Sequence, residues 1–427
     1  RRVGEIVARR DRKRAGDRKT DSLGVRLAGR RSITKLNEVR ESNLSQAFRV
    51  AVTQLRSAAV GLTLVLGACA TFEPDVQPPP PPPPPAPTPP PVVAPVATHQ
   101  FPFDPKTTGV LGELQVTQAR HEDTLADIAR RFNVGYDELR RANPGVDPWL
   151  PGEGTRIVLP TQWVLPDAPP EGIVVNVAAM RLFYFPKPAK NQKNQQRVVI
   201  TYPIGVGKVG WETPIGTTKI VSKRKNPVWS PPPSVRKEHA EKGDPLPAQV
   251  PAGPDNPLGA YAMNLGWPSY LMHGTNKPPG VGMRASHGCI RLYPEDIESL
   301  FGMIPIGMQV TVVNQPLLYR WQGNSLYVQS YPPVVEGMDE SVAPPAVVYD
   351  ERVSNAIWQQ SKVHAGSVNW DLVGRVVTQA QGIAVPVTKR GLTLDSYLAS
   401  ARRVENVLPE GSNWDGNDGP PAKGGVK

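Results

Sequence analysis

The residues best suited to covalent chemistry lie in the stretch Ser286-His-Gly-Cys-Ile-Arg291. Cys289 follows Gly288, whose missing side chain lets the backbone approach a ligand closely. His287 lies two residues before the cysteine, and His273 lies sixteen residues before it. A histidine within hydrogen-bond reach can take the thiol proton and later protonate a leaving amine. The pattern therefore predicts a cysteine nucleophile that attacks a carbonyl carbon.

The surroundings of Cys289 favour its reactivity. Arg291 follows two residues later and carries a fixed positive charge. We expect this guanidinium, or a nearby imidazolium, to lower the pKa of the thiol from ~8.5. Backbone N–H groups near the Gly-Cys turn can hold a developing oxyanion. The alternatives are an inert buried cysteine and a zinc site formed by Cys289, His273 and His287, for which the neighbourhood offers no obvious fourth ligand.

The elements around these residues are predicted to be strands. Residues 173–177, 181–185 and 197–202 are β-branched or aromatic runs between turn signals. Gly and Pro punctuate the stretch that follows, and no ten-residue helical pattern separates the strands. A parallel βαβ fold is therefore not expected. The pattern predicts a mainly β domain, a sandwich or barrel.

Residues 113–160 form a separate predicted unit. Thr124, with Asp127 three residues later, predicts a helix start with a variant capping box. Apolar residues then follow at spacings of three and four, as on one face of a helix. A second short helix ends at Asn143-Pro144-Gly145. The predicted order is strand, helix, helix, strand, at 114–119, 125–132, 136–143 and 155–159.

The basic charge of the chain is confined to its beginning. Residues 1–56 hold 16 Lys and Arg against 6 Asp and Glu, a net +10 of the +11 on the whole chain. Nucleic-acid binding needs a basic patch on the folded domain itself, so we expect none here. The first residue is Arg1 and the first methionine is Met180, so we expect a fragment or a non-Met start between Leu44 and Val52.

An export signal is predicted between this region and the folded part. The apolar run 58–66 is too short to span a bilayer of ~30 Å, and with its positive flank it is typical of a secretory signal. It ends in Leu66-Gly-Ala-Cys69, which resembles the bacterial lipobox and implies that Cys69 carries a lipid. An unrelated buried helix is the alternative. Residues 76–97 contain 13 prolines and predict an extended tether of roughly 70 Å.

The cysteine count supports a functional thiol. The chain has two cysteines, and the lipobox accounts for Cys69. Cys289 is then left without a disulfide partner in an exported, oxidising compartment, where an idle thiol is a liability.

Two stretches of the chain resemble known families. Residues 121–160, HEDTLADIARRFNV…GTRIVLP, resemble a LysM module, which implies binding to peptidoglycan glycans through residues 122–125 and 143–151. A generic small α+β domain is the alternative. Residues 273–292, HGTNKPPGVGMRASHGCIRL, resemble the active-site signature of the L,D-transpeptidase catalytic-domain family. That resemblance covers 171–315 and is greatest to the Gram-negative envelope branch, which joins a LysM module to this domain.

The resemblance implies a role for each matching residue. Cys289 is the nucleophile, and His273 is the general base, oriented by the carbonyl of Gly274. Much of the family has Asn where this chain has Arg291, a departure that concerns substrate detail. The remaining assignments are His287 shaping the pocket, the amides of Gly288 and Cys289 forming the oxyanion hole, and Arg291, Ser286, Asn276 and Arg284 binding substrate or bracing the loop.

The implied reaction is attack on the third residue of a peptidoglycan stem peptide, a diaminopimelate. The terminal D-Ala leaves, and a thioester remains. A second diaminopimelate (giving a 3→3 cross-link), the lysine of an outer-membrane lipoprotein, or water resolves it, and no metal or organic cofactor is needed. The alternatives are an L,D-carboxypeptidase and a non-catalytic LysM staple between wall and membrane. The expected location is the periplasm, at the cell wall, with a lipid anchor in the outer membrane.

The rest of the chain is less informative. A hairpin is predicted at 317–330 around the turn Gly323-Asn324, and short helices at 355–362, 371–381 and 392–404. We expect this tail to pack on the catalytic domain or cap its cleft, and its last fifteen residues to be disordered. The predicted division of the chain is leader 1–68, tether 69–112, LysM module 113–160, catalytic domain 171–315 and C-terminal extension 316–427.

Overall fold

A nine-stranded sheet dominates the computed structural model, which describes residues 99–188, 196–334, 351–361 and 368–408. All neighbouring strands are antiparallel except the pairs β6–β15 and β12–β14. The strand order is β1 (Gln100–Pro102), β8 (Val198–Pro203), β7 (Arg181–Phe185), β6 (Gly172–Asn176), β15 (Gln309–Val313), β10 (Gly216–Lys225), β11 (Tyr261–Leu265), β12 (Leu271–His273) and β14 (Ile290–Arg291).

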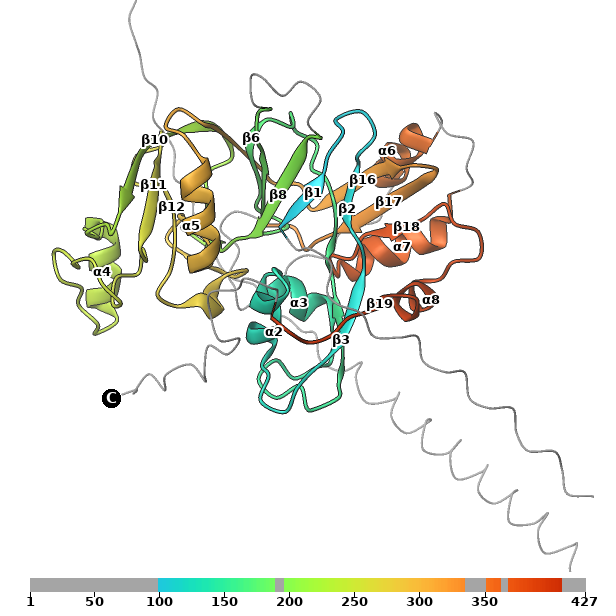
Figure 1. The fold of residues 1–427 in the computed structure, drawn as a ribbon, viewed down its shortest axis with the longest axis horizontal. Helices are drawn as coiled ribbons and strands as arrows, with labels where there is room; N and C mark the ends of the chain where they lie inside the picture. The colour runs from blue at the N-terminus through green and yellow to red at the C-terminus, as the bar shows by residue number, and fades with distance from the viewer. Residues whose placement is uncertain (1–98, 189–195, 335–350, 362–367, 409–427) are drawn as a thin grey trace, which may run out of the picture. The chain divides into compact units, whose positions relative to one another are not determined.

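The sheet curls around one hydrophobic core. Ile173 on β6 and Ile290 on β14 belong to the same buried cluster. In a flat sheet these two strands, five places apart in the order, would be separated by about 24 Å. The sheet must therefore bend over on itself, which confirms the predicted mainly β fold (Figure 1).

The predicted strands are confirmed, but two helices were missed. Strands β6, β7 and β8 lie within one residue of their predicted positions. Helices α4 (Pro233–Glu241) and α5 (Pro294–Met303) both begin with proline. The ten-residue helix α5 contradicts the expectation that no such helix separates the strands. It joins β14 to β15, which are not neighbours in the sheet, so it forms no βαβ unit.

The elements predicted for the LysM unit are confirmed. They are β3 (Gln115–Gln118), α2 (Leu125–Arg131), α3 (Tyr136–Ala142) and β4 (Arg156–Leu159). Thr124 caps α2, since its hydroxyl accepts from the N–H of Asp127 and the Asp127 carboxylate accepts from the N–H of Thr124. Leu125 and Ile128 have no exposed surface, so this short helix is held by its packed face more than by its own propensity.

A buried ion pair docks this module on the catalytic sheet. Arg181 on β7 has no exposed side-chain surface, and its Nη2 lies 2.8 Å from Oε2 of Glu138 on α3. The same nitrogen donates to the carbonyl of Asn133 at 2.8 Å. The guanidinium carbon lies 4.0 Å from the centre of the Trp163 ring, whose Nε1 donates to Glu138 at 2.7 Å. The two units are therefore joined through hydrogen-bonded charges enclosed between them.

The described part of the C-terminal extension packs on the LysM module and also on the catalytic domain, as expected, since Leu318 and Tyr331 share a buried cluster with Ala178 and Ala179. The hairpin is confirmed as β16 (Leu317–Gln322) and β17 (Ser325–Ser330). Helix α7 (Trp370–Gln379) shares a buried cluster with Leu114, Val116 and Val158 of the module. The remaining elements are β2 (Val110–Gly112) paired with β5 (Gln162–Val164), α6 (Glu351–Ser361), β18 (Val385–Pro386), α8 (Leu394–Ala399) and β19 (Arg402–Arg403).

One predicted helix in this extension is wrong in its second half. The stretch 392–404 contains α8, but Arg402 and Arg403 form strand β19, which pairs with Gln115 and Val116 of β3. A parallel partner from the far end of the chain completes the module's sheet, and that pairing overrides the local helical pattern.

Several predictions lie outside the described residues. They are the leader, the lipid on Cys69, the proline-rich residues 76–97 and the disordered last fifteen residues. The end of the predicted tether, 99–112, is described and is wrong, because β1 and β2 pair there with β8 and β5. Within the four described ranges, no helix has the length and apolar character needed to cross a membrane.

We predict that Arg181→Met destabilises the fold by about 3–5 kcal/mol, because it leaves the buried Glu138 carboxylate without its partner. Thermal and urea unfolding of the full chain measure the effect. The control is Arg140→Met on α3, the helix that carries Glu138; the Arg140 side chain is 51% exposed and pairs with Asp137. That change should cost less than about 1 kcal/mol. Equal, small losses in both variants would contradict the docking role of Arg181.

Candidate active site

A two-residue strand carries Cys289 to the edge of the sheet. Cys289 immediately precedes β14, which pairs in parallel with β12, so that Met272 lies beside Ile290 and His273 beside Arg291. The thiol is partly covered, and its Sγ lies 3.8 Å from the carbonyl oxygen of Ser269. The pairing brings together the cysteine, His273 and Arg291 that the sequence singled out.

Hydrogen bonds from two hydroxyls hold the turn that bears the thiol. Ser286 donates to the carbonyl of Cys289 at 2.6 Å. Thr213 donates to the carbonyl of Gly288 at 3.0 Å and accepts from the N–H of Gly207 at 3.0 Å. Ser286 is 1% exposed, so this geometry favours bracing of the loop over contact with a substrate.

Glycine is required at position 288 for two reasons. Its φ of +95° lies in a region that residues with a side chain rarely adopt. A Cβ there would also lie 2.6 Å from Cε1 of Tyr270. The Tyr270 ring therefore packs directly against the turn at the position before Cys289.

His273 is buried in one defined tautomer. Its Nδ1 lies 2.6 Å from the carbonyl oxygen of Gly274, and a carbonyl can only accept, so the proton sits on Nδ1 and Nε2 is left as the acceptor. Burial, with the nearby Arg291 charge adding to it, lowers the pKa of His273 to about 3. The ring is therefore neutral at physiological pH, and its unprotonated Nε2 can accept a hydrogen bond.

The thiol is not pre-ionised, which corrects one prediction from the sequence. Burial raises the pKa of Cys289 above its ordinary value, and this outweighs the lowering by the Leu271 main chain and by Arg291. The direction predicted for the influence of Arg291 is right, but the net shift is the opposite. Burial therefore keeps both the Cys289 thiol and the His273 ring neutral at rest.

The four expected substrate-binding residues are not grouped together. Arg291 and Arg284 lie on strands on either side of the segment 205–207, since Arg291 pairs with Gly205 and β13 (Arg284–Ser286) pairs with β9 (Val206–Gly207). Asn276 is exposed. Burial lowers the pKa of the Arg291 guanidinium. Arg291 is the candidate whose charge lowers the pKa of both Cys289 and His273.

His287 contacts groups that the sequence did not reveal. Its Nε2 lies 2.8 Å from Oε2 of Glu238, and its ring meets that of Trp211 edge-on with centres 4.8 Å apart. Among the described residues, no group of three or more His, Cys, Asp or Glu is arranged to hold a metal ion.

Comparison with known proteins identifies the family. Residues 170–312 match the family of L,D-transpeptidase catalytic domains, and residues 120–160 match the LysM domain family. The probable L,D-transpeptidase YcfS of Escherichia coli is 40% identical over 252 residues, which are 58% of this chain and 77% of that protein. The chain belongs to the L,D-transpeptidase family. It is thus an L,D-transpeptidase with a LysM domain.

Another relative has a similar identity, and two solved structures align with part of the chain at lower identity. The probable L,D-transpeptidase ErfK/SrfK of E. coli is 42% identical over 222 residues, 51% of this chain and 69% of that protein. Among solved structures, the Ldtfm-avibactam carbamoyl enzyme aligns with 37% of this chain and 55% of its own, at 23% identity and a TM-score of 0.26. L,D-transpeptidase 3 from Mycobacterium tuberculosis with a faropenem-derived adduct aligns with 38% and 75%, at 20% identity and 0.24.

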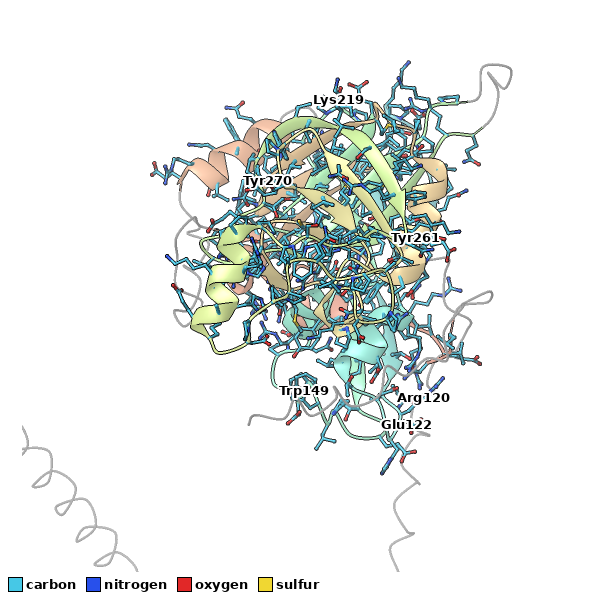
Figure 2. The ribbon with its side chains drawn as sticks, turned by 90° about the vertical axis from the view of Figure 1, so that its left-hand side faces the viewer. Arg120, Glu122, Trp149, Lys219, Tyr261 and Tyr270 are labelled. Carbon is cyan, nitrogen blue, oxygen red and sulfur yellow. The ribbon has the colours of Figure 1, made fainter. Side chains whose placement is uncertain are left out.

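The LysM domain presents an open surface where glycan contact was predicted. The N–H of Leu125 donates to the carbonyl of Pro148 at 2.8 Å, which joins the two predicted loops. Trp149 and Leu150 are 48% and 77% exposed, and Figure 2 shows Trp149 projecting at the same end as Glu122. Asn143, at the edge of the predicted stretch, is buried and bonds the main chain of Leu139 and Val158, so its role is structural.

We predict that Arg291→Gln makes Cys289 less reactive at neutral pH. Arg291 lowers the pKa of both the thiol and His273, so its loss raises both. Since alkylation requires thiolate, its pH profile should move to higher pH. Iodoacetamide labelling of the peptide that contains Cys289 measures this without any substrate. Arg291→Lys keeps the charge and should stay close to wild type; an unshifted profile in Arg291→Gln would contradict the coupling.

Proposed function

We propose that this L,D-transpeptidase forms a thioester between Cys289 and the diaminopimelate of a tetrapeptide stem. The observation that carries the proposal is the tautomer of His273. With Nδ1 bound to Gly274, the basic Nε2 is left for the thiol proton. Sγ bonds to the carbonyl carbon as its proton passes to His273. The C–N bond then breaks, and the same proton passes to the leaving amine of D-Ala.

The oxyanion formed during attack is held by the N–H groups of Gly288 and Cys289. The hydrogen bond from Thr213 fixes the carbonyl of Gly288. Because a peptide unit is planar, the N–H of Cys289 in the same unit is fixed as well. Donors that are already oriented before the reaction are the requirement for such stabilisation.

We assign substrate recognition to polar side chains near Cys289 and His273, above all Arg291. Arg291 lies beside His273 in the strand pairing and carries a planar guanidinium suited to a carboxylate. We assign it to a carboxylate of the stem peptide, with Arg284 and Asn276 as further contacts at its border. Ser286 and His287 act on the loop and the pocket wall.

An amine resolves the thioester in this proposal. The amine of a second diaminopimelate gives a 3→3 cross-link, and the lysine of an outer-membrane lipoprotein gives an attached protein. Water gives an L,D-carboxypeptidase, the alternative activity. The LysM domain binds the glycan strands, and lipid on Cys69 with the proline tether holds the enzyme between the outer membrane and the wall, in the periplasm.

The nucleophile is tested with Cys289→Ala. Purified full-length protein is incubated with disaccharide-tetrapeptide muropeptides, and the products are read by mass spectrometry. Wild type should release D-Ala and give dimers joined through two diaminopimelates, whereas the variant gives neither because no thioester forms. The control is Cys69→Ser, which retains Cys289 and should keep both products.

Other product patterns would change the assignment. Tripeptide without dimers supports the carboxypeptidase, or an enzyme that awaits a protein acceptor. Turnover by Cys289→Ala refutes the nucleophile. No product from wild type supports a non-catalytic staple.

Glycan binding is tested with Trp149→Ala. An exposed aromatic at the centre of a binding surface is typically a dominant contact, so affinity for purified sacculi should fall about tenfold or more. Co-sedimentation measures it. The control is Trp358→Ala on α6, a residue of similar exposure, 46% against 48%. Equal sedimentation of wild type and Trp149→Ala would contradict this surface.

A further inference from the structure

Glu238 links helix α4 to the histidine beside the nucleophile. Its Oε2 lies 2.8 Å from Nε2 of His287, and the two side chains are only 19% and 22% exposed. The Trp211 ring also packs edge-on against the imidazole, with ring centres 4.8 Å apart. His287 directly precedes Gly288 and Cys289. Contacts that orient the His287 ring therefore also act on the turn that carries the thiol.

The carboxylate of Glu238 is neutralised by two lysines. Oε1 lies 2.5 Å from Nζ of Lys208 and 2.6 Å from Nζ of Lys242. These contacts, that with Lys208 most of all, lower the pKa of Glu238 to about 2. An ionised carboxylate can only accept hydrogen bonds. His287 must therefore donate from Nε2, which leaves Nδ1 without a proton in the neutral ring.

The same cluster joins three segments that are distant in the sequence. Lys208 follows β9, and its N–H donates to the carbonyl of Ser286 at 2.9 Å. Lys242 is the C-terminal cap of α4. Helix α4 lies in the excursion 226–260 between β10 and β11, beside the ends of these strands (Figure 1). Glu238 is thus the point where this excursion, the β9 segment and the turn before Cys289 meet.

We propose that Glu238 is a positioning residue for the reaction, which keeps the proton of His287 on Nε2 and holds this ring, and with it the Gly288–Cys289 turn, in the orientation used for acylation. The proposal deepens the function proposed above and rests on Cys289 being the nucleophile. If Glu238 only held α4 in place, its contacts with Lys208 and Lys242 would suffice. The tautomer of His287 would then not depend on Glu238.

The chain contains a natural comparison on the same helix. Glu241, three residues after Glu238, lies 3.8 Å from Lys237, and these side chains are 65% and 78% exposed. Such a pair contributes little to stability, and within the described ranges Glu241 pairs with Lys237 and with no residue of the active site. Glu241 therefore serves as the matched control for charge removal on α4.

The charges around His287 fix the expected direction of its titration. Burial lowers the pKa of His287, Glu238 on α4 raises it, and Lys208 of the β9 segment and His239 on α4 lower it. Lys242 reaches the imidazole only through Glu238. Removal of the carboxylate leaves the lowering influences unopposed, so the midpoint must move to lower pH.

The test uses the full chain with Glu238→Ala, Glu238→Gln and Glu241→Ala. The ¹⁵N chemical shifts of the His287 ring nitrogens, assigned with a His287→Asn variant, report the tautomer and the titration midpoint without substrate. We expect a single Nε2–H tautomer in wild type and Glu241→Ala. In Glu238→Ala we expect a mixture of tautomers and a midpoint at lower pH. Acylation should slow up to about 100-fold, the loss typical of a misplaced group, with KM little changed.

The controls distinguish a loss of the Glu238–His287 contact from misfolding and from a failure of the proposed reaction. Glu238→Gln preserves size and can still accept a hydrogen bond, so a folded variant intermediate in tautomer and rate supports the proposal. Unchanged His287 shifts in folded Glu238→Ala would overturn it, whether or not activity falls. If wild type forms no thioester, the shifts still report the contact, and the reaction alone is refuted.

Discussion

The active site depends on the parallel pairing of two very short strands. Strands β12 and β14 have three and two residues, too few to be stable by themselves. Their partners Met272 and Ile290 have no exposed surface, and burial of each side chain contributes about 1.5–3 kcal/mol. The curled core thus holds the backbone of this pair, and the pair in turn holds His273 and Arg291 side by side next to the thiol.

The same burial sets the electrostatics of the site. It raises the pKa of Cys289 and lowers that of His273, so both groups rest uncharged. In the mechanism we propose, charge separates only as the thiol attacks. Arg291 favours the thiolate but disfavours an imidazolium on His273. The net effect of Arg291 on the reaction depends on where the negative charge lies. A substrate carboxylate bound to Arg291 would offset the destabilisation of the His273 imidazolium. In the proposed reaction, the Arg291 guanidinium would therefore couple substrate binding to proton transfer.

The sequence was most informative where the signal is local. The capping box at Thr124, the hairpin turn at Gly323 and strands β6–β8 follow from neighbouring residues, and so does the motif around Cys289. The missed features depend on distant partners: Glu238 meets a histidine 49 residues away, and β19 pairs with a strand near the other end of the described chain. The sign of the thiol pKa shift depends on burial, which the motif does not encode.

The module, the catalytic sheet and the extension are interdependent. Arg181 and Glu138 lie enclosed between the first two, and β19 and α7 cover the module from the far side. A buried charge pair stabilises little by itself, yet losing one partner is costly, so it enforces one docking geometry. The N–H groups of Tyr136 and Asp137 on α3 bond the carbonyls of Val281 and Gly282, just before β13. The LysM domain therefore supports the segment before β13 directly, and under the proposed function a glycan strand bound near Trp149 would be held at a fixed position relative to Cys289.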